Sequence, residues 1–532
     1  MSTSSERIVG LDGLRSARIR ILHNNAATRR LEANASSLLP PHTLMERAGL
    51  EVAHLLLAMA PHARTVWIPC GPGNNGGDGF ALARHLILRK ARVETFLVSS
   101  GSPSKGIAKK NMEILKSLKG PRLLKSEGDL SKAPFMEALK EAELVVDALF
   151  GTGFRGALRG IFFSLTEILN RSGLPVIAVD IPSGLSGDDP NPSGVVVQAA
   201  LTVALHGYKR AHLLPPAEDF CGELTLGSIG LPEEFGREES MLEILSPNLF
   251  PSLLAPRLKE SHKGSYGHLL VVGGSGTKPG APWMTSSSAL RSGVGLVTWA
   301  APPTAWGTLP PSPEMMLLPL RETKGEASGE DLDALLASLS DKSAVVVGPG
   351  LGLGRGAQRI VEALLTKCSL PVVVDADALT LLGLQAAKLW RPGVVYTPHP
   401  GEFLRISGAE KQAVERDRWK EGKRWAEEAR LWMVLKGHRT LVALPPKGFF
   451  LSLEGNPGMA VGGSGDILAG VLGALLARRV GNVPLEEAVL AGVYIHNRAG
   501  DLAAERFGQE GMTAMAIRDC LPEAFRLVKG ER

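Results

Sequence analysis

Short apolar runs alternate with helical patterns along the first part of the chain. Apolar runs end at Pro69 and at Gly184, and the amphipathic stretch "DGFALARHLILRKA" follows the first of them. Strand, helix and strand in this order predict a parallel sheet with helices on both faces. Ahead of these runs, residues 43–60 carry apolar side chains at helical spacing, with Thr43 as the expected N-cap and Glu46 as its capping-box partner.

A second alternating series follows a change in character. Residues 231–262 contain four prolines and no sustained strand period, which indicates a linker. The runs "GHLLVVGGSG", "SAVVVGPGLG" and "LPVVVDADAL" then begin another α/β series, which includes the apolar helix "SGDILAGVLGALLARRV". Because 532 residues are too many for one core, we predict two domains, 1–235 and 257–532, joined by a linker at 236–256.

The composition limits the class of protein. Hydrophobic residues make up 44% and charged residues 21%, as in ordinary soluble globular proteins. The net charge of +5 is spread without a basic block, so nucleic acid is not an expected partner. The four cysteines lie far apart, which argues against zinc and against a disulfide framework. The sequence shows no membrane-length apolar run and no signal-peptide core, so we expect a cytoplasmic protein without a membrane partner.

The loop "GPGNNGGDGF", from Gly71 to Phe80, follows an apolar run and is crowded with glycine. Glycine-rich turns of this kind hold phosphate on free backbone N–H groups, here with a helix expected to begin near Asp78. The loop lacks Gly-Lys-Ser/Thr, and its spacing differs from that of a dinucleotide fingerprint. It therefore predicts an anion site for something other than an ordinary nucleotide.

Three oxygen-bearing residues lie at the ends of predicted strands, namely Asn75, Asp147 and Ser183. Such oxygens suit a hard cation, although hydrogen bonds among loops would also explain them, above all for Asn75. Asp180 also lies at a strand end, before Pro182. Open α/β sheets bind ligands at this edge, which makes it the expected site.

In the second series, "NPGMAVGGSGDILAG" places Asp466 in the first turn of an apolar helix, after a run of glycines. The free N–H groups of such a helix start suit a phosphate in transfer. An aspartate there can take the proton of a substrate hydroxyl that attacks a phosphate. Alternatively, Asp466 only stabilises the helix N-terminus.

The second half resembles the ribokinase-like fold and, more narrowly, the ADP/ATP-dependent NAD(P)H-hydrate dehydratase family. The motifs "SHKGSYGHLLVVGGS", "GPGLG", "TPHPGEF" and "KGHRT" occur in the family's order within residues 255–525. Ser464 stands where the family usually has threonine, and it keeps the hydroxyl. The resemblance implies Asp466 as the catalytic base and the following nucleotide contacts: Lys436, Gly437, His438, Arg439, Thr440 and Gly465. It implies substrate contacts from Ala281, Gly350, His399 and Asp466, although His399 between two prolines would otherwise indicate a rigid surface turn.

The first half is similar to the NAD(P)H-hydrate epimerase family through "LMERAG", "GPGNNGGDG", "VDALFGTGFRG" and "VDIPSGL". The similarity implies that Asp180 is the acid/base residue and a substrate contact, and that potassium is bound by Asn75, Asp147 and Ser183. The other implied substrate contacts are Asn74, Asn75, Gly76, Gly77, Asp78, Gly151, Thr152, Gly153, Phe154, Arg155, Gly156 and Ala157.

Together the two resemblances imply an α/β protein with a Rossmann-like parallel-sheet domain followed by a ribokinase-like α/β domain. The first domain would interconvert the R and S hydrates of NADH and NADPH. The second would dehydrate the S form with ADP or ATP and Mg²⁺, ADP being favoured, and release phosphate. The alternative is a ribokinase-like small-molecule kinase with a non-catalytic N-terminal binding module. We expect small-molecule partners and a homo-oligomer.

Overall fold

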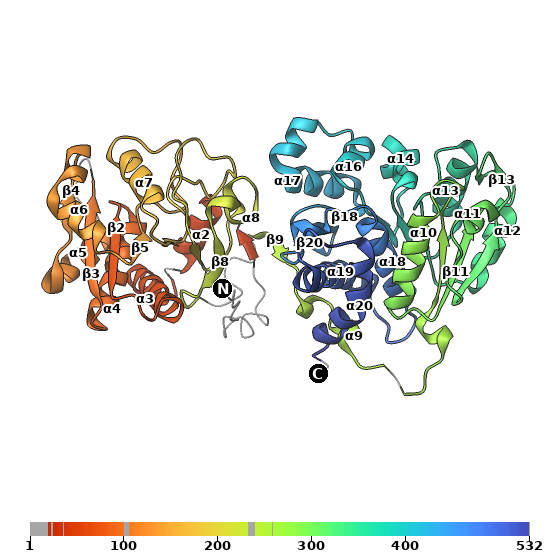
Figure 1. Cartoon of the computed structure of the whole chain (residues 1–532), viewed down its shortest axis with the longest axis horizontal. Helices are drawn as coiled ribbons and strands as arrows, with labels where there is room; N and C mark the ends of the chain where they lie inside the picture. Colours follow the sequence, from red (N-terminus) through yellow and green to blue (C-terminus); the bar gives the residue numbers. More distant parts are fainter. Residues whose placement is uncertain are drawn as a thin grey trace. The chain divides into compact units, whose positions relative to one another are not determined.

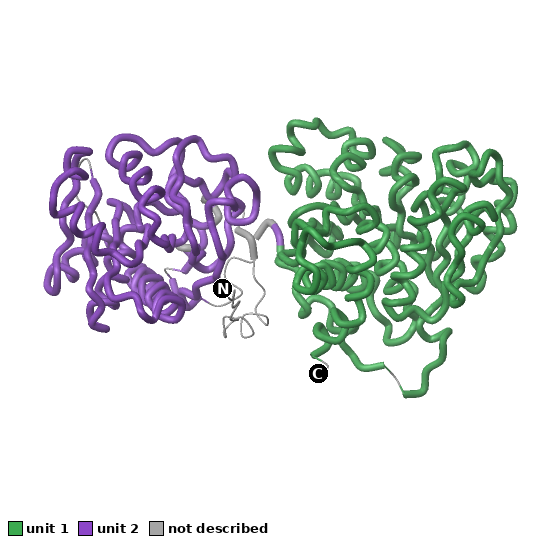
Figure 2. Tube along the Cα trace, viewed as in Figure 1, with its two compact units in different colours: residues 1–18, 243–532 green, residues 19–242 purple. Residues whose placement is uncertain are grey.

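The computed structural model describes residues 20–22, 25–35, 37–99, 106–231, 240–257 and 259–530. The chain divides into two compact units, one comprising Ile19–Leu242 and the other containing Glu243–Arg532 (Figure 2). We call them the N-terminal unit and the C-terminal unit. Each has its own sheet and its own cores, so each is described separately.

The N-terminal unit is built on a sheet in the order β4-β3-β2-β5-β6-β7-β8, in which every pairing is parallel (Figure 1). The strands are β2 (Thr65–Cys70), β3 (Arg92–Val98), β4 (Arg122–Leu124), β5 (Leu144–Asp147), β6 (Val176–Val179), β7 (Leu201–Leu205) and β8 (Glu223–Gly227). The order reverses between β2 and β5, which is the point where doubly wound sheets bind ligands. The predicted parallel sheet is confirmed.

Helices cover both faces of this sheet. Residues of α3, α4 and α5 form one apolar core with the strands, and residues of α6 and α7 form another on the opposite face. The helical elements are α2 (Asn25–Ala35), α3 (Pro41–Met59), α4 (Asn74–Leu88), α5 (Gly106–Lys119), η1 (Glu127–Ser131), α6 (Ala133–Lys140), α7 (Ile161–Arg171), α8 (Arg210–Leu213) and η2 (Ala217–Phe220), and the short strand β1 (Arg20–Leu22) precedes them.

Two helix starts differ from those expected. The helix α3 begins at Pro41, whose fixed φ suits the first turn, so Thr43 lies inside the helix and is not its N-cap. Glu46 is ion-paired with Arg84 of α4. The helix α4 begins at Asn74, four residues before Asp78, because its glycines let it press against the sheet. A Cβ at Gly79 would lie 2.6 Å from the Cβ of Ala148.

The C-terminal unit contains a mixed sheet that runs β9-β20-β19-β18-β17-β16-β15-β10-β11-β12. Its strands are β9 (Ser240–Ile244), β10 (His268–Val272), β11 (Leu296–Ala301), β12 (Met315–Pro319), β15 (Ala344–Val347), β16 (Val372–Val374), β17 (Val394–Tyr396), β18 (Trp432–Leu435), β19 (Leu441–Leu444) and β20 (Gly448–Leu451). The pairings from β12 to β18 are parallel, whereas β18, β19 and β20 pair antiparallel. The α/β class expected from the sequence is confirmed.

The largest core of this unit lies where α10, α18, α19 and α20 pack on one face of the sheet. Its helices are α9 (Pro251–Leu254), α10 (Gly280–Arg291), α11 (Pro303–Thr308), α12 (Leu332–Ala337), α13 (Arg355–Lys367), α14 (Asp377–Leu382), α15 (Ala386–Leu389), α16 (Pro400–Ser407), α17 (Lys411–Ala429), α18 (Ser464–Leu476), α19 (Leu485–Phe507) and α20 (Ala514–Val528). A two-stranded hairpin, β13 (Glu322–Thr323) with β14 (Glu326–Ala327), lies beside the sheet.

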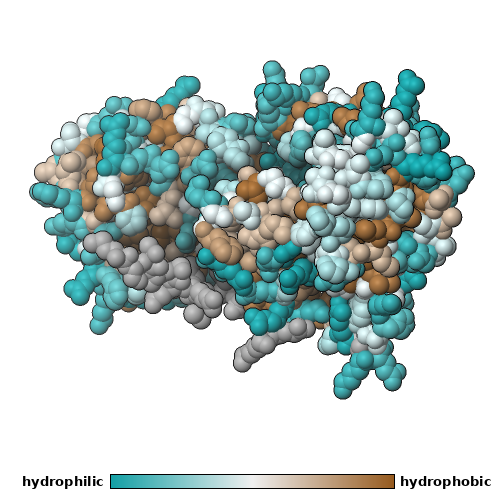
Figure 3. Space-filling view, turned by 45° about the vertical axis from the view of Figure 1, so that its right-hand side comes forward, coloured by the Kyte–Doolittle hydropathy of each residue, from teal (hydrophilic) through white to brown (hydrophobic). Residues whose placement is uncertain are grey.

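Part of the stretch that the sequence indicates as a linker is ordered in the C-terminal unit. The strand β9 pairs in parallel with β20, Glu243 opposite Phe450 and Ile244 opposite Leu451. Phe250 is fully buried in the large core. On the face that Figure 3 shows, hydrophilic side chains are common and apolar residues lie among them. No helix in the described part of the chain combines the length and the apolar character that crossing a bilayer requires.

Candidate active sites

The N-terminal unit contains a cavity of about 700 Å³ at the carboxyl edge of its sheet. Several predicted substrate contacts line it, namely Asn74, Asn75, Asp78, Gly151, Thr152, Gly153, Phe154, Arg155 and Asp180. Gly76 and Gly77 are instead buried within α4, while Gly156 and Ala157 lie in the same loop as Arg155 but outside the lining. The topology thus brings the α4 start and the loop after β5 to one hollow beside the strand-order reversal.

Of the three predicted potassium ligands, Asn75 lines this cavity, whereas Asp147 and Ser183 are fully buried and outside its lining. Asp147 is fully buried, and its carboxylate accepts hydrogen bonds from the Ser183 hydroxyl (2.7 Å) and from the Ser183 N–H (2.8 Å). Burial raises the pKa of Asp147 to about 6, although the bonds from Ser183 oppose this change. The side chain of Asn75 is buried beside Gly151, and its Nδ2 has no hydrogen-bond partner among the described residues.

The predicted acid/base residue forms a buried ion pair. Asp180 follows β6 with a φ of 65°, a strained value for aspartate that directs its side chain toward the cavity. Its Oδ1 accepts from the Nζ of Lys209 at 2.5 Å and from the Leu205 N–H at 3.1 Å. Lys209 follows β7 and also lines the cavity, as does His206, another residue with positive φ. Neither Lys209 nor His206 was predicted from the sequence.

In the C-terminal unit, the carboxyl ends of four neighbouring parallel strands lie side by side at one edge of the sheet. Gly350 follows β15, Asp375 follows β16, His399 follows β17 and Lys436 follows β18. The strand order reverses at β10, between β11 and β15, so these residues extend from the reversal along one edge of the sheet. Most of the chemical groups expected for a phosphoryl-transfer site therefore belong to one edge.

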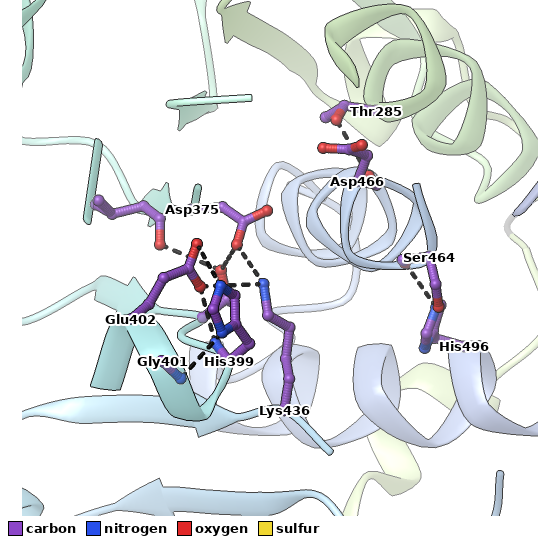
Figure 4. Close-up of polar contacts among 11 residues, drawn as sticks. Thr285, Asp375, His399, Gly401, Glu402, Lys436, Ser464, Asp466 and His496 are labelled. Atoms are coloured by element: carbon purple, nitrogen blue, oxygen red, sulfur yellow. Dashed lines mark hydrogen bonds and ion pairs between the residues drawn. The ribbon is translucent and has the colours of Figure 1, made fainter. Parts of the chain in front are cut away.

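Lys436 lies among carboxylates at this edge (Figure 4). Its Nζ is 2.7 Å from Asp375 Oδ1 and 3.8 Å from Glu402 Oε2. Burial alone would lower the pKa of Lys436, but the charges of Asp375 and Glu402 outweigh it and raise the pKa. A Cβ at Gly465 would lie 3.2 Å from this Nζ. The ammonium group therefore faces the start of α18.

Asp466 lies in the first turn of α18, after the left-handed Gly463. Burial raises the pKa of Asp466 to about 7, and the charge of Asp375 adds to the effect while Lys436 opposes it. The helix start is held from two sides: Thr285 of α10 donates to the Asp466 carbonyl at 3.1 Å, and His496 of α19 lies 3.0 Å from the Ser464 carbonyl (Figure 4). A carboxylate in this setting is suited to accept a proton near neutral pH.

The other predicted residues lie around this centre. Ala281 is on α10, and Gly350 has a φ of 60° next to the backbone of Lys278. His399 is the N-cap of α16 and accepts the Gly401 N–H at 3.0 Å, so it has a structural task as well. From Gly437 to Thr440 the chain forms the turn between β18 and β19, in which His438 is exposed and Thr440 is buried.

Sequence reasoning did not assign Asp375 or Glu402 to the site. Both are buried, and Glu402 Oε2 accepts the His399 N–H at 2.8 Å. A usable signal existed, because Asp375 directly follows the apolar run "PVVV" and therefore had to lie at the carboxyl edge of a parallel sheet. In the described part of the chain, no group of three or more His, Cys, Asp or Glu residues has the arrangement to hold a metal ion.

Comparisons with known proteins match both halves of the chain. A family described as NAD(P)H-hydrate dehydratase matches residues 269–523, and one described as YjeF-related protein N-terminus matches residues 41–211. The bifunctional NAD(P)H-hydrate repair enzyme Nnr of Moorella thermoacetica is 37% identical over 510 residues, covering 94% of this chain and 95% of the relative. The Escherichia coli enzyme of that name is 34% identical, covering 89% and 87%.

Among solved structures, the ADP/ATP-dependent NAD(P)H-hydrate dehydratase of Bacillus subtilis, co-crystallised with ATP/Mg²⁺, is 28% identical to this chain. The match covers 54% of this chain and 98% of the Bacillus subtilis chain, with a TM-score of 0.45. The full-length relatives decide the assignment, because they match both units in one chain. The chain belongs to the family of bifunctional NAD(P)H-hydrate repair enzymes.

Proposed function

We propose that this protein restores hydrated NADH and NADPH in two steps. The N-terminal unit epimerises the R and S hydrates, and the C-terminal unit dehydrates the S form with a nucleotide as phosphoryl donor. The observation that carries the proposal is the approach of the Lys436 ammonium to the start of α18, where Asp466 lies in the first turn, because it brings a fixed positive charge to the helix start that carries the proton acceptor. The names of the full-length relatives support the same assignment.

In the dehydration, Asp466 takes the proton of the substrate hydroxyl as the hydroxyl oxygen attacks the terminal phosphorus of the nucleotide. The bond from that phosphorus to the bridging oxygen breaks. The N–H groups at the start of α18 and the ammonium of Lys436 stabilise the charge on the transferred group. The phosphorylated oxygen then leaves as phosphate, the ring nitrogen supplies the electron pair, and loss of a ring proton restores the double bond. We expect ADP to be the preferred donor.

The residues fit a magnesium ion that is held mainly by the nucleotide. Mg²⁺ keeps several waters and usually takes only one or two carboxylates together with substrate phosphates. Asp375 and Glu402 are buried carboxylates at the carboxyl edge of the sheet, where the nucleotide is expected to bind. Among the described residues, no larger group of metal-binding side chains is found. These two residues would hold the ion, which would supply positive charge to the phosphates.

In the epimerisation, Asp180 is the acid/base residue at the substrate carbon. Asn75, Asp147 and Ser183 offer amide, carboxylate and hydroxyl oxygens, which suit a hard cation such as K⁺. The fit rests on one observation: Asp147 is a fully buried carboxylate with no cationic partner among the described residues. A bound K⁺ would balance the charge of Asp147.

The test is incubation of the full chain with mixed hydrate epimers and either ADP or ATP. We expect the ultraviolet absorbance of NADH to return in full, with one phosphate released per NADH recovered. A small-molecule kinase with a non-catalytic N-terminal module would instead leave a stable phosphate ester and would not exhaust the R epimer faster than the spontaneous rate. Either of these results would contradict the proposal.

A further inference from the structure

The ion pair between Lys209 and Asp180 is a second chemical group in the N-terminal cavity. The two side chains meet at 2.5 Å, and Lys209 is only 3% exposed although it lines the cavity. Lys209 comes from the segment after β7, whereas Asp180 follows β6. Two neighbouring strands of the parallel sheet thus present opposite charges to the same hollow.

The hydrogen bonds leave each partner with one position for a substrate. Asp180 Oδ1 accepts from Lys209 and from the Leu205 N–H, and within the described residues Oδ2 has no such bond. An ammonium group has three N–H bonds. The Lys209 ammonium donates one hydrogen bond to Asp180 and a second to the Leu205 carbonyl at 2.9 Å. The described residues provide no acceptor for its third N–H bond.

His212 fixes the backbone at this point. Its Nδ1 accepts the Lys209 N–H at 3.1 Å, and the ring is fully buried. Burial and, to a smaller extent, the charge of Lys209 lower the pKa of His212 to about 3, so the ring stays neutral at physiological pH. His212 therefore positions Lys209 and does not compete with it for protons.

We propose that Lys209 is the catalytic acid that works with Asp180 as the base in epimerisation, an inference that rests on the proposed function of this unit. In the hydrate, the hydroxyl oxygen and the ring nitrogen are bonded to the same carbon, so two adjacent groups can reach both. Asp180 takes the hydroxyl proton, the C=O bond forms, and the carbon–nitrogen bond breaks. The electron pair goes to the nitrogen, which takes a proton from Lys209. The opened aldehyde rotates, and the reverse transfers close the ring on its other face.

The competing explanation is that Lys209 only balances the charge of Asp180. Lys209→Arg separates the two roles, because a guanidinium keeps the charge but does not release its proton. Lys209→Ala removes both and opens space for a small amine. Lys132→Ala is the matched control, since Lys132 also pairs with an aspartate at 2.5 Å, but it is 67% exposed and outside the cavity lining. Dehydration of pure S hydrate by each variant reports whether the chain is folded.

We expect Lys209→Ala and Lys209→Arg to slow epimerisation by at least about 10²-fold, with dehydration of the S hydrate and the Lys132→Ala variant unchanged. Added ethylammonium should restore epimerisation in Lys209→Ala, and more acidic ammonium ions should restore it faster. Near-normal epimerisation by Lys209→Arg, or loss in Lys209→Ala that no amine reverses, would overturn the inference. Absence of epimerisation in the unaltered protein would instead refute the proposed function of the unit.

Discussion

Replacing Asp466 by asparagine tests the chemistry and the energetics of the C-terminal site together. The carboxylate of Asp466 has its pKa raised from the ordinary 3.8 to about 7 by partial burial and by Asp375. Since one pKa unit corresponds to about 1.4 kcal/mol, ionised Asp466 costs the folded state at most about 4 kcal/mol. Asp466 is only partly buried, so solvent screening reduces this ceiling, and we expect Asp466→Asn to stabilise the unit by about 1–3 kcal/mol.

The sign of the pH dependence follows from the direction of the pKa change. A group whose pKa is raised in the folded state makes the folded state less stable as pH rises. For Asp466 this loss begins at its unfolded pKa, near 4, and is complete above its folded pKa, near 7. The stability difference between Asp466→Asn and the unaltered protein should therefore widen between about pH 4 and about pH 7. Calorimetric unfolding measures this difference, and the shift caused by bound ADP identifies the transition of the C-terminal unit.

Activity should change in the opposite direction, because asparagine cannot accept the hydroxyl proton. Dehydration should fall by about 10²–10⁴-fold. Asp333→Asn makes the same change in the first turn of α12, where the side chain is exposed. This control should alter neither the stability nor the rate of dehydration. Near-normal dehydration by Asp466→Asn would rule out Asp466 as the base. A stability difference that does not vary with pH would show that Asp466 is not the group with the raised pKa.

Three further predictions concern both units. In the free enzyme, kcat/KM for dehydration should rise as pH increases through about 7, because Asp466 must lose its proton; a profile that is flat there would contradict this. Asp147→Ala should slow epimerisation and abolish its dependence on K⁺, whereas equal indifference of both proteins to K⁺ would refute the cation site. Asp180→Ala should stop epimerisation yet convert the S share of mixed epimers promptly, and loss of dehydration in a folded variant would show that the two sites are coupled.

The sequence predicts the sheets and their carboxyl edges well, because apolar runs followed by glycine, aspartate or asparagine have few other uses. It predicts helix starts less well. Thr43 had the chemistry of an N-cap, but Pro41 set the backbone two residues earlier. The glycines of α4 suggested a loop, although their contacts with the sheet make them part of the helix. Long-range packing decided both cases, and local pattern does not report it.

The site residues that the sequence did not reveal were missed for a different reason than the helix starts. Lys209 is 29 residues beyond Asp180, and no glycine run marks its position. Only the adjacency of β6 and β7 brings the two together, and strand order cannot be read from one sequence. Glu402 was part of a motif already noted, but its contact with the backbone of His399 and its approach to Lys436 depend on the placement of α16 against β18.

The pairing of β9 with β20 determines where this chain can be divided. The N–H of Leu245 donates to the Leu451 carbonyl at 2.8 Å, and together with the β9 ladder it occupies the outer edge of β20. A dehydratase produced alone from Pro247 onward would leave that edge open, and an open strand edge recruits strands from other molecules. Such a shortened protein should precipitate even though its catalytic residues are intact. Starting it ahead of Ser240 keeps β20 paired with β9, so the folding of the separated half depends on a strand well outside its active site.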